Sequence, residues 1–456
     1  MNMHTQISPV MHKLSGYIAA GLRRPLPTAV IEKTKHHILD TLAAMISGSR
    51  LTPGKKAISY VKTLGGAKEA AVIGSKIVTT AVNAALANGM LAHADETDDS
   101  HAPSLTHPGC GIVPAALAMA ERERRNGTAL LRAVALGYDV GCRLTQALDA
   151  RQFREDGHST HSFGPMFGAA AAAGALAGLR ELQVRHVLSF TAQQASGISC
   201  WMRDRDHIEK SFDFGGMPAR NGVAAATMVA SGFTGVDDVF DGERNFFAVY
   251  GRKPEPELLV RGLGVEFEII NTNIKRWSVG SAIQAPLDSL RDLLGEHRFN
   301  PDDVEKVVVR VSHQGANTVD NRDMADICMQ HMCAVMLLDG TVTFASSHDQ
   351  KRMRGRAVLA LRQRIELRGD DALTVAMPSR QGIVEITLRD GRKLSHHTQA
   401  VRGAAENPMT RAEVDEKSFD LIAPVIGKVR ARKLCDAIWR LEKLADVRSL
   451  RPLLRA

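Results

Sequence analysis

The run from Phe167 to Leu179 constrains the fold most, because almost all of its residues are alanine or glycine. It is too short to cross a bilayer and carries no charge, so we interpret it as a buried helix. Aromatic residues make up only 5% of the 456 residues, while hydrophobic residues make up 44%. The core must therefore use many small side chains, which let neighbouring helices approach closely. The sequence predicts a core of closely packed helices.

Helical periodicity dominates the first 270 residues. Apolar residues recur at helical spacing from Thr28 to Gly48, and glycine is a common helix end. The same pattern predicts further helices over Ala81–Ala92, Val113–Arg124 with Pro114 in its first turn, Leu130–Leu148, Phe167–Gly178, Arg185–Ile198 and Asn221–Gly232. We expect residues 1–270 to form the N-terminal part of a helical domain.

The pattern changes after residue 270. Val304–His313 is rich in valine and predicts a strand. Ile383–Leu388 and Lys393–Thr398 flank Asp390-Gly391, which favours a tight hairpin turn. Helices are expected between these strands, over Met324–Leu338 and Gly355–Leu361. Residues 271–406 are therefore predicted to form a smaller α+β domain.

Helical signals return after Asn407-Pro408. Thr410–Glu413 fits a capping box, and Ala431–Leu444 repeats leucine and isoleucine at helical spacing. The simplest topology returns residues 407–456 to the helical domain. The predicted fold class is mainly α with α+β: a large all-helical domain, and a smaller α+β lid able to cover a cleft.

Charge and cysteine usage restrict the partners. The formal net charge is +8, with a pI of about 9.2, and it is spread along the chain. We therefore expect small anions as partners, no nucleic acid and no membrane. Six cysteines show no metal-finger or cluster spacing, which predicts buried free thiols in a reducing compartment. The N-terminal segment lacks the features of a signal peptide, so a cytoplasmic location is expected.

The segment from His93 to His107 is the most polar in the chain. It carries three histidines and four carboxylates between two predicted helices. Three interpretations are open. His93, Asp95, Asp98, Asp99 and His101 are metal-ligand types, although no metal-binding spacing such as HExxH is present. The segment could instead be an acid–base site, or a solvated loop that caps the next helix.

The order of several motifs resembles the MmgE/PrpD family. The polar segment and the following helix read HADETDDSH and THPGCGIVPAALAMAE. Further landmarks follow in family order over nearly the whole chain: Gly157–Thr160, Gln194–Gly197, Lys210, Ala219–Gly222, Ile274–Arg276, Met336–Gly340 and Asn407–Met409. Each motif by itself is weak evidence for the family, whereas the ordered set of motifs is specific for it.

The resemblance implies an enzyme without organic cofactor or metal, and a homodimer with a cleft between its two domains. The family includes 2-methylcitrate dehydratases, cis-aconitate decarboxylases and iminodisuccinate epimerases. We expect a lyase acting on a small di- or tricarboxylate, most simply by 2-methylcitrate dehydratase-like loss of water. Decarboxylation or epimerisation through the same carbanion is the alternative. A more distant alternative is a non-catalytic protein that binds anions or nucleic acid.

The resemblance also implies the site residues, position by position. The catalytic candidates are Glu96, His107, His158, Lys210 and Lys275. The substrate-binding candidates are Asp98, Asp99, Ser100, His101 and Arg276. Lysine and histidine suit this chemistry, because they pair with substrate carboxylates and stabilise the charge that builds up when a carbanion forms. His161 competes with His158 for the same role, and Asp98 and Asp99 could orient histidines instead of reacting.

Four departures from the family pattern, in three segments of the chain, concern the substrate. Asp213 stands where relatives commonly have a histidine, and the segment after Lys210 is one residue longer. The loop around His158 is also one residue longer. Arg276 is followed by Trp277-Ser278, where relatives often have an aromatic residue and proline. Since a cation is replaced by Asp213, we expect a substrate with fewer carboxylates.

Overall fold

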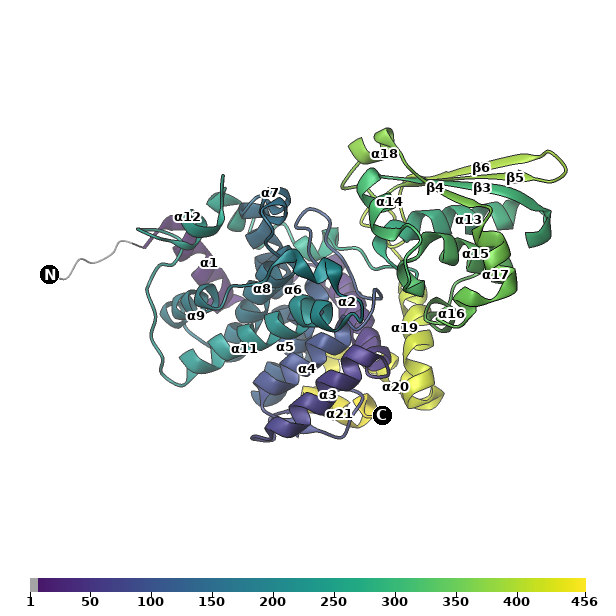
Figure 1. Ribbon diagram of the computed structural model, residues 1–456. Helices are drawn as coiled ribbons and strands as arrows, with labels where there is room; N and C mark the ends of the chain where they lie inside the picture. The colour runs from purple at the N-terminus through teal and green to yellow at the C-terminus, as the bar shows by residue number, and fades with distance from the viewer. Residues whose placement is uncertain (1–6) are drawn as a thin grey trace. The chain divides into compact units, whose positions relative to one another are not determined.

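The computed structural model describes residues 7–456, and the chain divides into two compact units (Figure 1). The first unit comprises Met1–Thr272 together with Arg411–Ala456, and the second comprises Asn273–Thr410. The fold class predicted from the sequence, mainly α with an α+β part, is confirmed. No helix within residues 7–456 combines the length and apolar character needed to cross a membrane.

The first unit is built from helices and one minimal sheet. Its α-helices are α1 (Pro9–Ala20), α2 (Thr28–Gly48), α3 (Thr52–Leu64), α4 (Ala81–Ala92), α5 (Pro108–Arg122), α6 (Gly127–Ala147), α7 (Ala150–Glu155), α8 (Thr160–Leu176), α9 (Glu181–Gln193), α10 (Ile208–Ser211), α11 (Met217–Ala230), α12 (Phe246–Tyr250), α19 (Arg411–Ile426), α20 (Lys428–Trp439) and α21 (Arg451–Leu454). The antiparallel pair is β1 (Ala70–Ala71) with β2 (Val78–Thr79). The remaining turns are the π-helix η2 (Phe212–Gly216) and the 3-10 helices η1 (Ser199–Arg203), η3 (Pro256–Leu259), η4 (Glu268–Asn271), η9 (Leu441–Lys443) and η10 (Val447–Leu450).

Helix α8 lies at the centre of this unit, where it packs against α5, α6, α9 and α11. Every residue of α8 is buried. The packing against α6 is close: a Cβ added at Gly168 would lie 2.4 Å from the backbone oxygen of Gly137. The prediction that small residues allow close helix packing is thus confirmed at this contact.

Helix α5 begins earlier than the sequence pattern indicated. Its first residue is Pro108, not Val113, so Pro114 lies inside the helix instead of in its first turn. The expected position of Pro114 was therefore wrong. Pro108 takes the first helical position, where a missing N–H costs nothing. Pro114 has no backbone N–H, so it cannot donate the helical hydrogen bond to the residue four positions earlier.

The C-terminal helices belong to the first unit, where α19 packs on α2 and α20. Lys417 of α19, whose side chain is 7% exposed, joins them to the site loop. Its Nζ atom lies 2.6 Å from Asp40 Oδ1 and donates a hydrogen bond of 3.0 Å to the carbonyl of Thr97. Burial raises the pKa of Asp40 to about 6 even though Lys417 lowers it.

The second unit is an α+β layer structure. Its strands are β3 (Val304–Val311), β4 (Ile365–Gly369), β5 (Gly382–Leu388) and β6 (Lys393–Thr398), in the order β4-β3-β5-β6. Its α-helices are α13 (Gln284–Glu296), α14 (His313–Val319), α15 (Met329–Asp339), α16 (Phe344–Ser347), α17 (Arg356–Arg362) and α18 (Asp371–Val375), with 3-10 turns η5 (Ser281–Ile283), η6 (Pro301–Asp303), η7 (Ala325–Ile327) and η8 (Arg352–Arg354).

The β5–β6 hairpin turns at Asp390-Gly391 as predicted, and Gly391 has a φ of 87°. The parallel pairing of β3 with β4 was not predicted. From Val307 onwards β3 alternates buried and less buried residues, which directs Val307, Val309 and Val311 to the core. Helices α13 and α15 cover that face (Figure 1).

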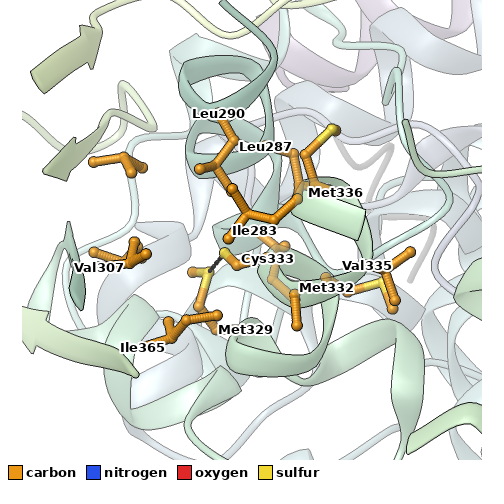
Figure 2. Close-up of a cluster of buried hydrophobic side chains, with 14 of the residues drawn as sticks. Ile283, Leu287, Leu290, Val307, Met329, Met332, Cys333, Val335, Met336 and Ile365 are labelled. Carbon is orange, nitrogen blue, oxygen red and sulfur yellow. Dashed lines mark hydrogen bonds between the residues drawn. The ribbon is translucent and has the colours of Figure 1, made fainter. Parts of the chain in front are cut away.

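The core between these helices and the sheet is aliphatic and sulfur-rich. Figure 2 shows Leu287 and Leu290 of α13 facing Met332 and Met336 of α15, near Val307 and Ile365 of the sheet. The thiol of Cys333 lies 3.8 Å from the sulfur of Met329. Five of the six cysteines are buried, and all six are free thiols, as predicted.

Candidate active site

The polar segment between α4 and α5 is buried. His93 ends α4, His107 precedes α5, and of the residues between them only Ala102, Pro103 and Leu105 have more than minor exposure. A solvated loop is therefore excluded. Burying this many ionisable groups is costly unless they are paired, and the contacts around Asp98 and Asp99 provide that pairing.

Asp98 joins two histidines. Its Oδ2 atom lies 2.9 Å from Nδ1 of His93, and its Oδ1 atom lies 3.1 Å from Nδ1 of His107. Burial by itself raises the pKa of Asp98, but the two imidazoles more than offset it and hold that pKa well below its ordinary value. The carboxylate therefore stays charged and orients both rings through their Nδ1 atoms.

Asp99 holds the loop and the start of α5. It accepts hydrogen bonds from His37 at 2.7 Å, from the hydroxyl of Tyr138 at 2.5 Å and from the backbone N–H of Gly109 at 2.9 Å. These three donors use both carboxylate oxygens of Asp99, which fits the orienting role considered from the sequence.

The other substrate-binding candidates of the loop are also buried. His101 Nδ1 lies 2.7 Å from Ser104 Oγ, and its Nε2 lies 3.2 Å from Glu268. Ser100 is buried next to it. A role of Ser100 or His101 in substrate binding stays a prediction.

Lys210 reaches the loop from α10. Its ammonium group forms an ion pair with Glu96, and its side chain is only 18% exposed. The same ammonium lies 5.5 Å from the ring centre of Trp201 and 5.2 Å from that of Phe214. A surface lysine is therefore excluded. The cation is held by a carboxylate and two aromatic rings beside the buried histidines.

Phe214 is the centre of this cluster. His161 stacks on it at a ring-centroid distance of 3.7 Å and His93 at 4.2 Å, while His107 meets it edge-on at 5.4 Å. His107 and His161 are 5.2 Å apart. Burial, reinforced by His107, lowers the pKa of His161 well below its ordinary value, so this ring is neutral near pH 7.

A π-helical turn brings Phe214 there. The residues after Lys210 form η2, the kind of turn that accommodates one extra residue in a helix, and the sequence comparison had indicated one extra residue here. Gly215 makes the turn possible, because a Cβ on it would lie 2.1 Å from the backbone oxygen of Gly89 in α4. Gly89 is equally constrained, because a Cβ added to it would lie 2.3 Å from the backbone oxygen of Gly215.

Asp213 points to a different neighbour. Its Oδ2 atom accepts a hydrogen bond of 2.5 Å from Ser159 Oγ, and burial raises its pKa to about 7. The aromatic ring of Phe214, and not this carboxyl group, contacts the histidines.

His158 lies elsewhere. Its ring stacks on Phe153 at 4.4 Å and meets Tyr250 at 5.9 Å, and its carbonyl accepts a hydrogen bond from Ser199 Oγ. Within residues 7–456 the ring contacts of His158 are with Phe153, Phe163 and Tyr250, and they include neither His107 nor Lys210. The structure therefore brings together His107, Lys210 and Glu96 from the predicted catalytic set, and adds His161 in place of His158.

Lys275 and Arg276 belong to the second unit. Lys275 is 3% exposed, which excludes a surface lysine. The guanidinium of Arg276 lies 4.9 Å from the ring centre of Trp277, whose Nε1 donates to Asp288 at 3.0 Å. The roles of both residues in a site stay predictions.

Two groups of buried residues have metal-ligand chemistry: His93 with Glu96 and His207, and His93 with Asp98 and Cys110. No sequence pattern pointed to His207, Trp201 or Phe214, because their contacts with the site histidines are tertiary. From the sequence, His93 was considered only as a possible metal ligand, and His161 only as an alternative to His158.

The family was then tested by comparison with known proteins. The MmgE/PrpD N-terminal domain matches residues 12–259, and the MmgE/PrpD C-terminal domain matches residues 277–443. The chain belongs to the MmgE/PrpD family.

Similar proteins of known activity include two cis-aconitate decarboxylases. The one from Aspergillus terreus is 23% identical over 94% of this chain and 92% of its own length. The one from Mus musculus is 24% identical over 98% of this chain and 94% of its own length. Because decarboxylases are lyases, the MmgE/PrpD membership and these relatives support a lyase-type function.

Proposed function

We propose that this MmgE/PrpD protein is a cofactor-independent lyase that decarboxylates a small unsaturated polycarboxylate of the cis-aconitate type. The observation that carries the proposal is the buried His107–Asp98 pair beside the Lys210–Glu96 pair around one aromatic ring. The cis-aconitate decarboxylases among its relatives favour decarboxylation over the loss of water that the sequence alone favoured. A homodimer and a cytoplasmic location stay part of the proposal.

Decarboxylation needs charge stabilisation and one proton. The carbon–carbon bond to the leaving carboxylate breaks, carbon dioxide departs, and its electron pair spreads over the double bond and a remaining carboxylate. Lys210 would stabilise that developing negative charge. His107, held by Asp98 in a form that supports a positive charge, would then deliver a proton to carbon. The two aromatic rings beside Lys210 help to keep its side chain mostly shielded from water, which strengthens these electrostatic interactions.

Loss of water from a 2-methylcitrate-like hydroxy acid is the second candidate. It needs a base to remove the α-proton and an acid to release hydroxide as water. The 5.2 Å separation of the His107 and His161 rings favours it, because it offers two imidazoles for these two tasks. Epimerisation requires only that the proton be removed and returned on the other face.

Proton NMR in heavy water distinguishes decarboxylation, loss of water and epimerisation. Chelator-treated protein is incubated with cis-aconitate, 2-methylcitrate, citrate and an amino-dicarboxylate. We expect cis-aconitate to lose carbon dioxide and give a new vinylidene signal with one deuterium incorporated. A new vinyl signal from a hydroxy acid would instead establish a dehydratase, and deuterium exchange alone an epimerase.

Matched variants connect the result to the site. Lys210→Met should lower turnover by about 100-fold or more, since removing one charge-stabilising donor has an effect of this size. Lys428→Met, which removes an exposed lysine of α20, should leave turnover unchanged. No conversion of any substrate would contradict the proposed activity and favour a non-catalytic anion-binding protein.

A further inference from the structure

Two buried imidazoles beside the Lys210–Glu96 pair each have a ring nitrogen without a hydrogen-bond partner. His93 is 0% exposed and His207 is 5% exposed, and the Nε2 atom of each makes no hydrogen bond within the described part of the chain. Their ring centroids are 5.1 Å apart. Since an unpaired buried polar atom costs free energy, these two nitrogens indicate a place that a ligand would stabilise.

The tautomer of His93 makes its Nε2 atom a lone-pair donor. Its Nδ1 atom lies 2.9 Å from Asp98 Oδ2, and a carboxylate can only accept, so the proton lies on Nδ1. A neutral ring then presents an unshared electron pair at Nε2. Metal-binding histidines commonly have this arrangement, in which the second ring nitrogen donates to a carboxylate.

Glu96 supplies a third donor. One donor atom each of His93, Glu96 and His207 lies within 4.8 Å of the other two. Ligand atoms around a tetrahedral zinc ion with bonds of about 2.0–2.1 Å are about 3.3 Å apart. The donor atoms of any two of these three residues must therefore move closer to each other by at most about 1.5 Å to bind such an ion. Side-chain rotation can supply a movement of that size.

We propose that His93, His207 and Glu96 form a binding site for a divalent transition-metal ion such as Zn²⁺ or Co²⁺, with water in the fourth position. Two imidazoles and one carboxylate suit these ions better than Mg²⁺ or Ca²⁺. The site is not required by the proposed reaction and does not depend on it.

The backbone at His207 supports a functional position. Its φ is 60°, in the left-handed region that residues other than glycine rarely adopt. Conformations of this kind cost free energy and cluster at binding and catalytic sites. Lys210 follows three residues later and pairs with Glu96, so the metal ion and the lysine compete for one carboxylate.

Cobalt titration tests the site through a spectroscopic signal. Tag-free, full-length, chelator-treated protein is titrated with Co²⁺, and visible d–d absorption reports a tetrahedral site, while equilibrium dialysis gives the stoichiometry. We expect one ion per chain, displaced by Zn²⁺. His207→Asn should weaken binding by at least about tenfold, because it removes a ligand while asparagine tolerates the positive φ. Glu96→Gln should weaken binding similarly, and serves if His207→Asn does not fold.

Two controls complete the test. His186→Asn removes a buried imidazole that pairs with the half-exposed Asp237, and should leave binding unchanged. Cys110→Ala probes the alternative group of His93, Asp98 and Cys110, and should also leave it unchanged. The proposal is overturned if the protein binds no Co²⁺, if Cys110→Ala abolishes binding while His207→Asn retains it, or if every variant binds equally, which would indicate adventitious surface binding.

Discussion

Asp98 and His107 form a hydrogen bond of 3.1 Å in a loop where the carboxylate is completely buried and the imidazole nearly so. Because Asp98 stays charged, it fixes the orientation of the ring and favours its protonated form. We therefore expect Asp98→Asn to keep the fold but lower kcat by about 100-fold or more, since the variant loses proton transfer from an oriented histidine. Circular dichroism checks the fold, and turnover within about threefold of wild type would contradict the role.

The two candidate histidines of the next loop give a paired test. His161 stacks on Phe214 within the cluster, and His158 stacks on Phe153 outside it, so both lose a similar stacking contact when changed to glutamine. We expect His161→Gln to lower kcat by at least about 30-fold, a modest share of a general acid–base contribution, and His158→Gln to leave it within about threefold. Both values of kcat are measured with one substrate at saturation. A larger loss of kcat in His158→Gln than in His161→Gln would assign the acid–base role to His158.

Asp213 predicts a pH-dependent stability difference. Its pKa is about 7 in the folded protein against an ordinary value of 3.8, so the folded state binds the extra proton between these pH values. The free energy of unfolding therefore falls as pH rises from about 4 to about 7 on account of this group. Asp213→Asn removes that penalty and keeps an acceptor for Ser159.

Urea denaturation of the two proteins measures this difference. The Asn variant should be the more stable one, and its advantage should grow by roughly 2 kcal/mol between pH 5 and pH 8. An advantage that is constant over this range would show that Asp213 does not titrate with a raised pKa.

The contact between α4 and the π-helical turn predicts a steric effect on the site. A Cβ at Gly89 would lie 2.3 Å from the backbone oxygen of Gly215, so Gly89→Ala should destabilise the protein by about 1–3 kcal/mol and displace the turn that follows Lys210. Gly174→Ala in α8 is the control, because a Cβ added there would lie 3.9 Å from its nearest neighbour, the side chain of Leu179. It should be neutral, or stabilising by about 0.5–1 kcal/mol. Equal effects of the two changes on unfolding would contradict the close contact.

Local patterns predicted local structure well. The expected bounds of the helices at Thr28–Gly48 and Ala81–Ala92 match α2 and α4, because a continuous apolar periodicity ends there at clear signals. Strand β4 was missed although Ile365-Glu366-Leu367-Arg368 alternates apolar and charged residues, because a run of five residues is too short to be distinguished from a helix end by its pattern alone. The start of α5 was missed because glycines and prolines obscure its periodicity.

The site was predictable only in part. The motif order pointed to His107, Lys210 and Glu96, and the structure places these residues around one cluster. Phe214 and His207 join that cluster through contacts between segments about 100 residues apart, which no local pattern encodes. The extra residue was visible in the sequence, but its consequence, a π-helical turn that presents Phe214 instead of Asp213, depends on packing against α4.

The most direct test of the central claim is carbon dioxide release from cis-aconitate by chelator-treated wild-type protein and by His107→Gln. The account predicts steady release by the wild type and a loss of about 100-fold or more in the variant, with both proteins folded. Equal release by the two proteins would contradict the assignment of the proton donor, and no release by the wild type would contradict the proposed decarboxylation.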